Sequence, residues 1–343
     1  MIKVAKRGIF LLFLLLYCSN NSSVTDIEEI KEDRQDIYEV DIYNLGGFCE
    51  GIRFEVSPVP ISQRESNRIV TIIKDVDIVD DPLSAECDIN GDGIIDGIGG
   101  FSSLSSFSLR QLTEALKKDI VDGKLSLLFE FQDIIAPEIP YSEGGKIIYY
   151  EGIDFDQNPL NNFEGGAYFL IDENYLDDSG NPIYQGELSY VNKFFLGSYS
   201  DLVLSFSYGN PLTNEDIPVI LVIRNVMIKG CASPYFTSIK RFYMCGYVLA
   251  KELADIPSPI IGFDSLLSLL VSQSNGKLID IDVNQDGGLD RVYLSDDSSI
   301  IAQCYDREQR VYRFCSSEEL QDGISMILKM EAIWVNLLEN DYY

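Results

Sequence analysis

Short runs of alternating apolar and polar residues restrict this chain to a mainly β fold. Leu202, Leu204 and Phe206 alternate with Val203 and Ser205, which is the period of a strand with one buried face. Residues 52–56 and 125–131 alternate similarly, and 218–228 is almost continuously β-branched, as in a strand covered on both faces. Shorter strands are expected at 147–150 and 168–171. Because turn residues separate the runs, we predict an α+β, mainly β fold: an antiparallel β-sandwich or barrel-like body with a few short helices.

The clearest helix is predicted to begin at Ser108, with Gln111 completing a capping box and Gly123 just past the end. Its apolar stripe consists of Leu109, Leu112, Leu116 and Ile120. Weaker helical patterns cover residues 247–255 and 263–272, and Ser316 with Glu319 has the form of a helix cap. Residues 324–334 fit both a strand and a helical period, so that segment stays open.

The pattern Asp-x-Asn-x-Asp-Gly-x-x-Asp occurs twice, at residues 88–96 and 282–290. Oxygen-bearing side chains at positions 1, 3, 5 and 9, with glycine at position 6, suit a hard cation that needs converging oxygens and a sharp turn. We therefore predict two Ca²⁺ sites, with a backbone carbonyl at position 7; the alternative is a pair of turns without metal. The predicted ligands are Asp88, Asn90, Asp92, Ile94 and Asp96 in the first loop, and Asp282, Asn284, Asp286, Gly288 and Asp290 in the second.

These loops resemble those of dockerin modules, thrombospondin type 3 repeats and EF-hands, over about nine residues each. Position 12, an acid in an EF-hand, is Gly99 in the first loop and Tyr293 in the second, so neither is a standard EF-hand. The missing ligand is water or a neighbouring acid: Glu86, Asp80 or Asp81 for the first loop, and Asp280, Asp296 or Asp297 for the second. The layout of a loop followed by an apolar helix also resembles a group of uncharacterised bacterial surface lipoproteins.

The amino terminus has the form of an export signal. Lys3, Lys6 and Arg7 precede the apolar run 9–17, which is too short to span a bilayer. Cys18 follows in a context that resembles a bacterial lipobox, although the bulky Tyr17 precedes it. We expect a signal peptide at 1–17, a lipidated tether at 18–40, and β-rich regions at 41–200 and 201–343 that could form one continuous domain. Cleavage near residues 20–23 without lipid is the alternative.

The seven cysteines agree with export, because assigning Cys18 to lipid leaves six for an oxidising compartment. Six cysteines allow 15 pairings. Proximity in the sequence favours Cys49–Cys87, Cys231–Cys245 and Cys304–Cys315; the alternative is that some remain free and buried.

The net charge of −29 argues against nucleic acid as a partner. The chain has no histidine, which excludes Ser-His-Asp catalysis and histidine-ligated zinc. We therefore expect a calcium-binding, disulfide-stabilised outer-membrane or cell-surface lipoprotein with a non-enzymatic role. Its partners would be the membrane, through the lipid, and an unknown protein, glycan or apolar ligand. The alternatives are a carboxylate-dependent hydrolase of glycosidase type, with acids such as Glu130 and Asp133, and a carrier whose cavity is lined by residues 220–228.

Overall fold

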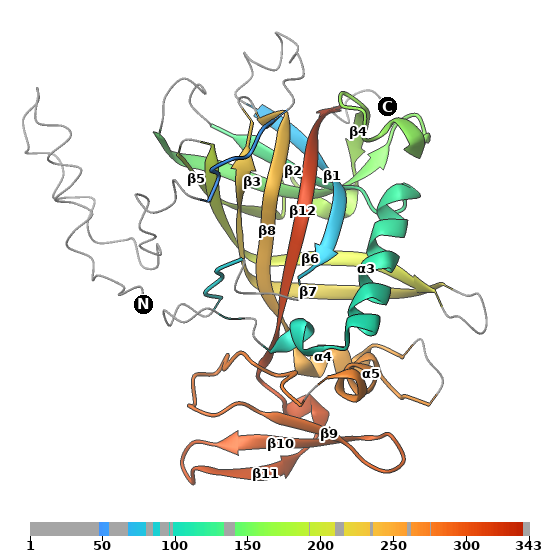
Figure 1. Ribbon diagram of the computed structural model, residues 1–343, viewed down its shortest axis with the longest axis vertical. Coiled ribbons are helices and arrows are strands. Elements are labelled where there is room, and N and C mark those ends of the chain that lie inside the picture. The colour runs from blue at the N-terminus through green and yellow to red at the C-terminus, as the bar shows by residue number, and fades with distance from the viewer. Residues whose placement is uncertain are drawn as a thin grey trace, which may run out of the picture.

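Eight antiparallel strands close into a barrel (Figure 1). The computed structural model describes residues 48–54, 68–79, 85–89, 96, 99–133, 141–191, 193–209, 216–233, 236–258, 262–274 and 276–338. In spatial order the strands are β1 (Arg68–Ile78), β2 (Leu127–Gln132), β3 (Tyr141–Asp154), β5 (Tyr184–Val191), β6 (Phe194–Gly209), β7 (Asp216–Ala232), β8 (Ser238–Leu249) and β12 (Gly323–Leu337). Each strand pairs with the next in this order, and β12 pairs with β1, so the ring has no free edge. The mainly β, barrel-like prediction is confirmed.

Aromatic rings from several strands fill the barrel. Phe242 of β8 lies 5.1 Å from Phe129 of β2 and 5.4 Å from Phe195 of β6, measured between ring centroids. Phe129 also lies 5.4 Å from Tyr149 of β3. Side chains fill the interior of a barrel of this size. In the 220–228 segment, Leu221 and Ile223 belong to the main core while Ile220 is exposed, so this strand gives no support to a ligand-lined cavity.

The predicted helix is present as α3 (Ser106–Val121), which packs along β1 and β6. Its stripe of Leu109, Leu112, Leu116 and Ile120 is buried, as predicted. The helix starts two residues earlier than predicted. The Ser105 amide donates to the Gln273 carbonyl at the end of another helix, a long-range contact that a capping pattern does not reveal.

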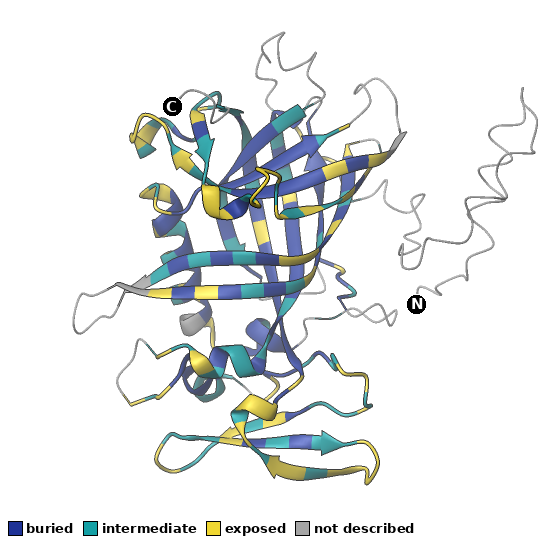
Figure 2. Ribbon diagram, turned by 180° about the vertical axis from the view of Figure 1, so that it is seen from behind, coloured by how far each residue is buried: buried dark blue, intermediate teal, exposed yellow. Residues whose placement is uncertain are grey.

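A small three-stranded sheet extends the molecule beyond one end of the barrel. It consists of β9 (Arg291–Leu294), β10 (Ile300–Asp306) and β11 (Val311–Cys315), joined to the barrel near α4 (Ala250–Asp255) and α5 (Leu266–Gln273) (Figure 1). The predicted helix at 247–255 is helical only from Ala250, because the preceding residues extend β8. Helix α5 begins after Ser265, whose side chain forms a capping box with Ser268. Figure 2 shows that the small sheet is mainly of intermediate exposure or exposed, while the barrel strands carry most of the buried residues.

The carboxy-terminal segment is strand β12, which pairs with β1 on one side and β8 on the other. Its residues from Gly323 to Leu328 are buried without interruption. Ile324, Met326 and Leu328 alternate as in a strand, but Ile327, Trp334 and Leu338 also fit a helical face, which is why the sequence fits both periods. Ser316 and Glu319 do form a capping box, on the short 3-10 helix Ser317–Glu319.

The expected boundary between residues 200 and 201 falls inside β6, and strands from both sides of it form the same barrel. The short strand β4 (Tyr168–Ile171) pairs with the end of β3 in antiparallel orientation and with the end of β12 in parallel orientation. Residues 52–54 lie outside any strand, and the rest of that predicted strand lies outside the described residues.

Three disulfides link the six cysteines that follow Cys18. Cys304–Cys315 is confirmed, whereas the other two predicted pairs are wrong. The observed partners are Cys49 with Cys231 and Cys87 with Cys245. Proximity in sequence failed because β7 and β8 run alongside segments about 160 to 180 positions earlier in the chain. Cys18 and the expected signal and tether lie outside the described residues.

Candidate functional site

The second Asp/Asn loop, residues 282–290, folds back on its own backbone between α5 and β9. Asp282 accepts hydrogen bonds from the amides of Asp286, at 3.2 Å, and Gly287, at 2.9 Å. Asn284 accepts from the Asp286 amide at 3.0 Å, and Asp286 accepts from the Gly288 amide at 3.0 Å. The side chains at positions 1, 3 and 5 therefore turn inward, toward the space that the loop encloses.

Two glycines allow this turn. Gly287, at position 6, has a φ of 91°, a left-handed conformation that residues with a Cβ rarely adopt. A Cβ on Gly288 would stand 2.5 Å from the ring of Tyr305. The loop therefore needs glycine at position 6 for its backbone conformation and at position 7 for close packing against β10.

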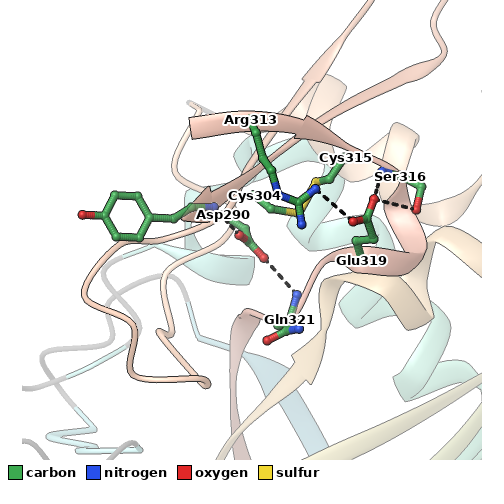
Figure 3. Close-up of polar contacts among 8 residues, drawn as sticks. Asp290, Cys304, Arg313, Cys315, Ser316, Glu319 and Gln321 are labelled. Carbon is green, nitrogen blue, oxygen red and sulfur yellow. Dashed lines mark hydrogen bonds and ion pairs between the residues drawn. A yellow bond between two sulfur atoms is a disulfide. The ribbon is translucent and has the colours of Figure 1, made fainter. Parts of the chain in front are cut away.

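Asp290, at position 9, bonds to backbone outside the loop, and its place in the calcium ligand set stays a prediction. Its carboxylate is buried and accepts hydrogen bonds from the backbone amides of Tyr305, at 3.1 Å, and Gln321, at 2.9 Å (Figure 3). A carboxylate held by two amides in this way fastens β10 and the segment before β12 to the loop. It therefore joins the loop, β10 and the segment before β12, while the side chains at positions 1, 3 and 5 bond to amides of the loop itself.

Asp322 is a buried acid that sequence reasoning missed. Its carboxylate accepts from the Val283 amide at 3.1 Å and the Asp290 amide at 2.7 Å, so it supports both ends of the loop. Burial, with the neighbouring Asp290 and Asp282, raises the pKa of Asp322 to about 7. No local motif marks Asp322, because it lies 32 positions after its partner Asp290.

An ion pair and a disulfide hold the outer edge of this region (Figure 3). Arg313 of β11 donates to Glu319 at 2.9 Å, and Glu319 also accepts from the Ser316 amide at 2.9 Å. Cys304 and Cys315 bridge β10 and β11. These contacts fix the segment that carries Gln321 and Asp322 under the loop.

Only part of the first loop falls within the described residues. The Asp96 carboxylate accepts from the Ile89 amide at 2.6 Å, and the Asp96 amide donates to the Cys87 carbonyl at 2.7 Å. Asp88 is half-buried. The predicted ligands Asn90, Asp92 and Ile94, and the acids Asp80 and Asp81, lie outside the described residues.

The two loops, far apart in the sequence, meet at the base of β12. Ile89 of the first loop and Val283 of the second contribute to one apolar cluster with Ile281 and Ile327. Asp280 lies between the loops: its carboxylate accepts from the Ser325 amide at 2.8 Å and the Ser325 hydroxyl at 2.6 Å. Burial, with a contribution from Asp96, raises the pKa of Asp280 to about 7. The shared cluster couples the packing of the loops.

Asp297, another acid suggested for the second loop, is hydrogen-bonded within its own turn. Asp297 accepts from the Ser299 hydroxyl at 2.7 Å in the turn between β9 and β10, and bonds to Ser295 and Ser299 lower its pKa to about 2. Among the described residues, no group of three or more Asp, Glu, Cys or His side chains is arranged to hold a metal. Positions 1, 3 and 5 of the second loop offer two carboxylates and one amide oxygen, so Asp290, backbone carbonyls or water would have to complete a calcium shell.

A pocket of about 630 Å³ lies beside the second loop. Arg291 lines it, and its guanidinium carbon lies 3.7 Å from the ring centroid of Tyr312. Lys277 and Tyr293 also line it, with Asp280 and Asp290, whose carboxylates are bonded to Ser325 and to backbone amides. Arg291 and Lys277 form no ion pair with any described residue. The pocket therefore brings together two cationic side chains, two hydrogen-bonded carboxyl groups and aromatic rings.

The acids suggested for hydrolysis are not arranged as a catalytic pair. Glu130 is completely buried and forms an ion pair with Arg68, which holds it through two hydrogen bonds. Asp133 is exposed beyond the end of β2. Glu130 therefore balances a partner charge in the barrel wall.

Comparison with family models, with curated proteins and with solved structures finds no significant match to this chain. Across the described ranges, no helix has both the length and the apolar character needed to cross a membrane.

Proposed function

We propose that this chain is an exported, disulfide-stabilised and calcium-binding surface lipoprotein with a non-enzymatic binding or structural role. The observation that carries the proposal is the inward set of side chains in residues 282–290, where Asp282, Asn284 and Asp286 each accept amides of their own loop. This is the arrangement by which a short Asp/Asn loop surrounds a hard cation. The three disulfides support export, because such bonds persist in oxidising compartments.

Calcium has a structural role in this proposal. The loop carries the charge of two carboxylates and lies against Asp322 and Asp290, so a divalent cation would reduce repulsion among four acids. A ligand that binds only the folded state raises the free energy of unfolding by about 2.7 kcal/mol when its concentration is 100 times Kd. Lipidation at Cys18 would anchor the same body to a membrane.

The test is a calcium titration followed by thermal unfolding. We expect the melting temperature of the chelator-treated protein to rise with added calcium, and Asp282→Asn/Asp286→Asn to lose much of that rise. The double variant Asp178→Asn/Asp255→Asn removes the same charge from exposed positions and should respond like the wild type. Equal calcium responses of wild type and the loop variant would overturn the role of the second loop.

A binding role has a specific candidate location in the pocket beside this loop. Arg291 lies over Tyr312, an arrangement that presents a guanidinium edge and an aromatic face together. Lys277 adds a second cation, and both carboxylates of the pocket are engaged elsewhere. A small planar ligand with a carboxylate matches this chemistry, and the volume lies within the range of ligand sites.

Benzoate, with neutral benzamide as its shape control, probes the pocket by saturation-transfer NMR and calorimetry. We expect benzoate to bind more tightly than benzamide. Arg291→Gln should weaken benzoate binding about 10-fold or more, since a charge-assisted hydrogen bond is lost. Arg307→Gln, an exposed change in the turn after β10, serves as control. Equal binding of both probes, or no effect of Arg291→Gln, would exclude an anion site here.

A further inference from the structure

The loop that joins β3 to β4 contains buried polar atoms without hydrogen-bond partners. Asn162 is completely buried, and neither its Oδ1 nor its Nδ2 has a partner among the described residues. Asp154 Oδ2 and Asn161 Oδ1 are buried and unpartnered as well. Buried polar atoms are paired in nearly all folded proteins, so several unpaired atoms within nine residues indicate a partner from outside the protein.

Two acids accompany these atoms, and no cation of the described chain neutralises them. Burial raises the pKa of Asp154, and the neighbouring Asp156 carboxylate raises it further. The Asn162 amide lies near enough to lower that pKa slightly, although its geometry falls short of a hydrogen bond. None of the ion pairs in the described chain includes either acid. The site therefore has two carboxylates and no positive side chain.

The backbone of this loop winds around its own side chains, as residues 282–290 do. Asp154 accepts from the Asp156 amide at 3.3 Å, Asp156 from the Asn158 amide at 2.9 Å, and Asn158 from the Leu160 amide at 3.4 Å. Asn161 donates its Nδ2 to Asp156 at 2.7 Å, which leaves its Oδ1 unpartnered. Oxygens at positions 154, 156, 158 and 162 repeat the spacing 1, 3, 5 and 9.

The loop differs from the two sequence motifs at position 6, where Pro159 replaces glycine. Here the turn is made by the 3-10 helix η5 (Pro159–Asn161), with Asn158 as its cap. The loop rests on the end of α3, where a Cβ on Gly123 would stand 3.0 Å from Pro159 (Figure 1). The carboxy-terminal end of a helix carries partial negative charge and favours a nearby cation.

We propose that residues 154–162 bind a calcium ion through the carboxylates of Asp154 and Asp156 and the amide oxygens of Asn158, Asn161 and Asn162. Calcium takes six to eight oxygen ligands in flexible geometry, and amide oxygens are among its usual ligands. Two carboxylates balance its charge. Zinc is disfavoured, since the loop contains no sulfur or imidazole. This site depends on neither the second motif nor the pocket.

Trp334, the single tryptophan, makes this site separately observable. A Cβ on Gly166 would stand 2.8 Å from its ring, and the Gly166 amide donates to its carbonyl at 3.1 Å, so the ring packs on a residue four positions after Asn162 in the chain. Terbium occupies calcium sites and emits when a nearby tryptophan is excited. Terbium bound here should therefore emit on tryptophan excitation, and added calcium should suppress that emission.

The experiment compares the chelator-treated full chain with Asp154→Asn/Asp156→Asn and Asp282→Asn/Asp286→Asn. We expect tryptophan-sensitised terbium emission in the wild type and in the variant at 282 and 286. The variant at 154 and 156 should bind terbium about 10-fold or more weakly, because affinity follows the charge count of the ligands. Circular dichroism in chelator checks that each variant folds. Asn158→Ala, at an exposed position, gives the same test with milder change if the double variant does not fold.

Absence of tryptophan-sensitised emission in the wild type would overturn the proposal, as would emission that calcium does not suppress. Unchanged affinity in a folded variant at 154 and 156, or in Asn158→Ala, would also overturn it. A calcium response that only Asp282→Asn/Asp286→Asn removes would support the proposed function and reject this third site. Loss of terbium emission only with the changes at 154, 156 or 158 would support this third site and reject calcium binding by the second loop.

Discussion

Lys229 shows how the barrel wall alters the chemistry of a single side chain. It is 7% exposed, and its Nζ donates to the carbonyl of Glu86 at 3.0 Å and lies 5.4 Å from the Phe48 ring centroid. Burial lowers the pKa of Lys229 to about 8, and the Glu86 charge opposes only part of that shift. The folded protein therefore carries a lysine that resists protonation.

The stability of the protein should increase with pH because of Lys229. Unfolded lysine has a pKa of about 10.4, so between pH 8 and that value the unfolded chain binds more protons than the folded one. From pH 7 to 9.5 we expect the free energy of unfolding of the wild type to rise by about 2 kcal/mol relative to Lys229→Met. Urea unfolding at both pH values measures the difference.

Lys240→Met is the matched control, because Lys240 lies on neighbouring β8 and makes an exposed contact with the Arg53 carbonyl. It should change with pH as the wild type does. Tyrosine ionisation above pH 10 is common to all three proteins and cancels. Parallel pH profiles for wild type and Lys229→Met would contradict the lowered pKa.

The elements differ in how well their sequence patterns predict them. Helix α3 was predictable because one face lies on the barrel and the other on solvent, so its apolar residues recur with a helical period. Strand β12 was ambiguous because its first residues are buried on both faces, so that the apolar Ile327 lies between the alternating Met326 and Leu328 and adds a helical period. A pattern identifies an element only when its two sides meet different environments.

The two kinds of Asp/Asn loop also differ in how well their sequences predict them. Residues 282–290 were found because glycine at position 6 is part of a recognisable motif. Residues 154–162 were missed because Pro159 and a short 3-10 helix make the turn instead. What distinguishes that loop is the burial of Asn162 without a partner, which depends on its packing against the end of α3.

The disulfides determine how the whole molecule holds together. Cys49–Cys231 and Cys87–Cys245 fasten segments near the amino terminus to β7 and β8, across separations of 182 and 158 residues. Cys304–Cys315 closes only a hairpin, with a separation of 11. Because a disulfide restricts the unfolded chain more when it closes a longer loop, the three bonds should differ in their effect on stability.

Removing a long-range disulfide should cost more than removing the hairpin disulfide. We expect Cys49→Ala/Cys231→Ala or Cys87→Ala/Cys245→Ala to lower the free energy of unfolding by about 5 kcal/mol, against about 3 kcal/mol for Cys304→Ala/Cys315→Ala. Guanidinium unfolding of the three double variants gives the comparison. Equal losses, or the largest loss in the hairpin variant, would contradict this order.

Local patterns alone were enough to establish the mainly β class, the buried stripe of α3 and the positions of two Asp/Asn loops. These features reflect interactions between residues a few positions apart. The long-range disulfide partners, the bonds from the Tyr305 and Gln321 amides to Asp290, and the meeting of both loops at β12 appeared only in the folded chain. Each depends on which distant strands lie side by side in the closed barrel, and that register arises from the packing of the whole chain, which no short segment encodes.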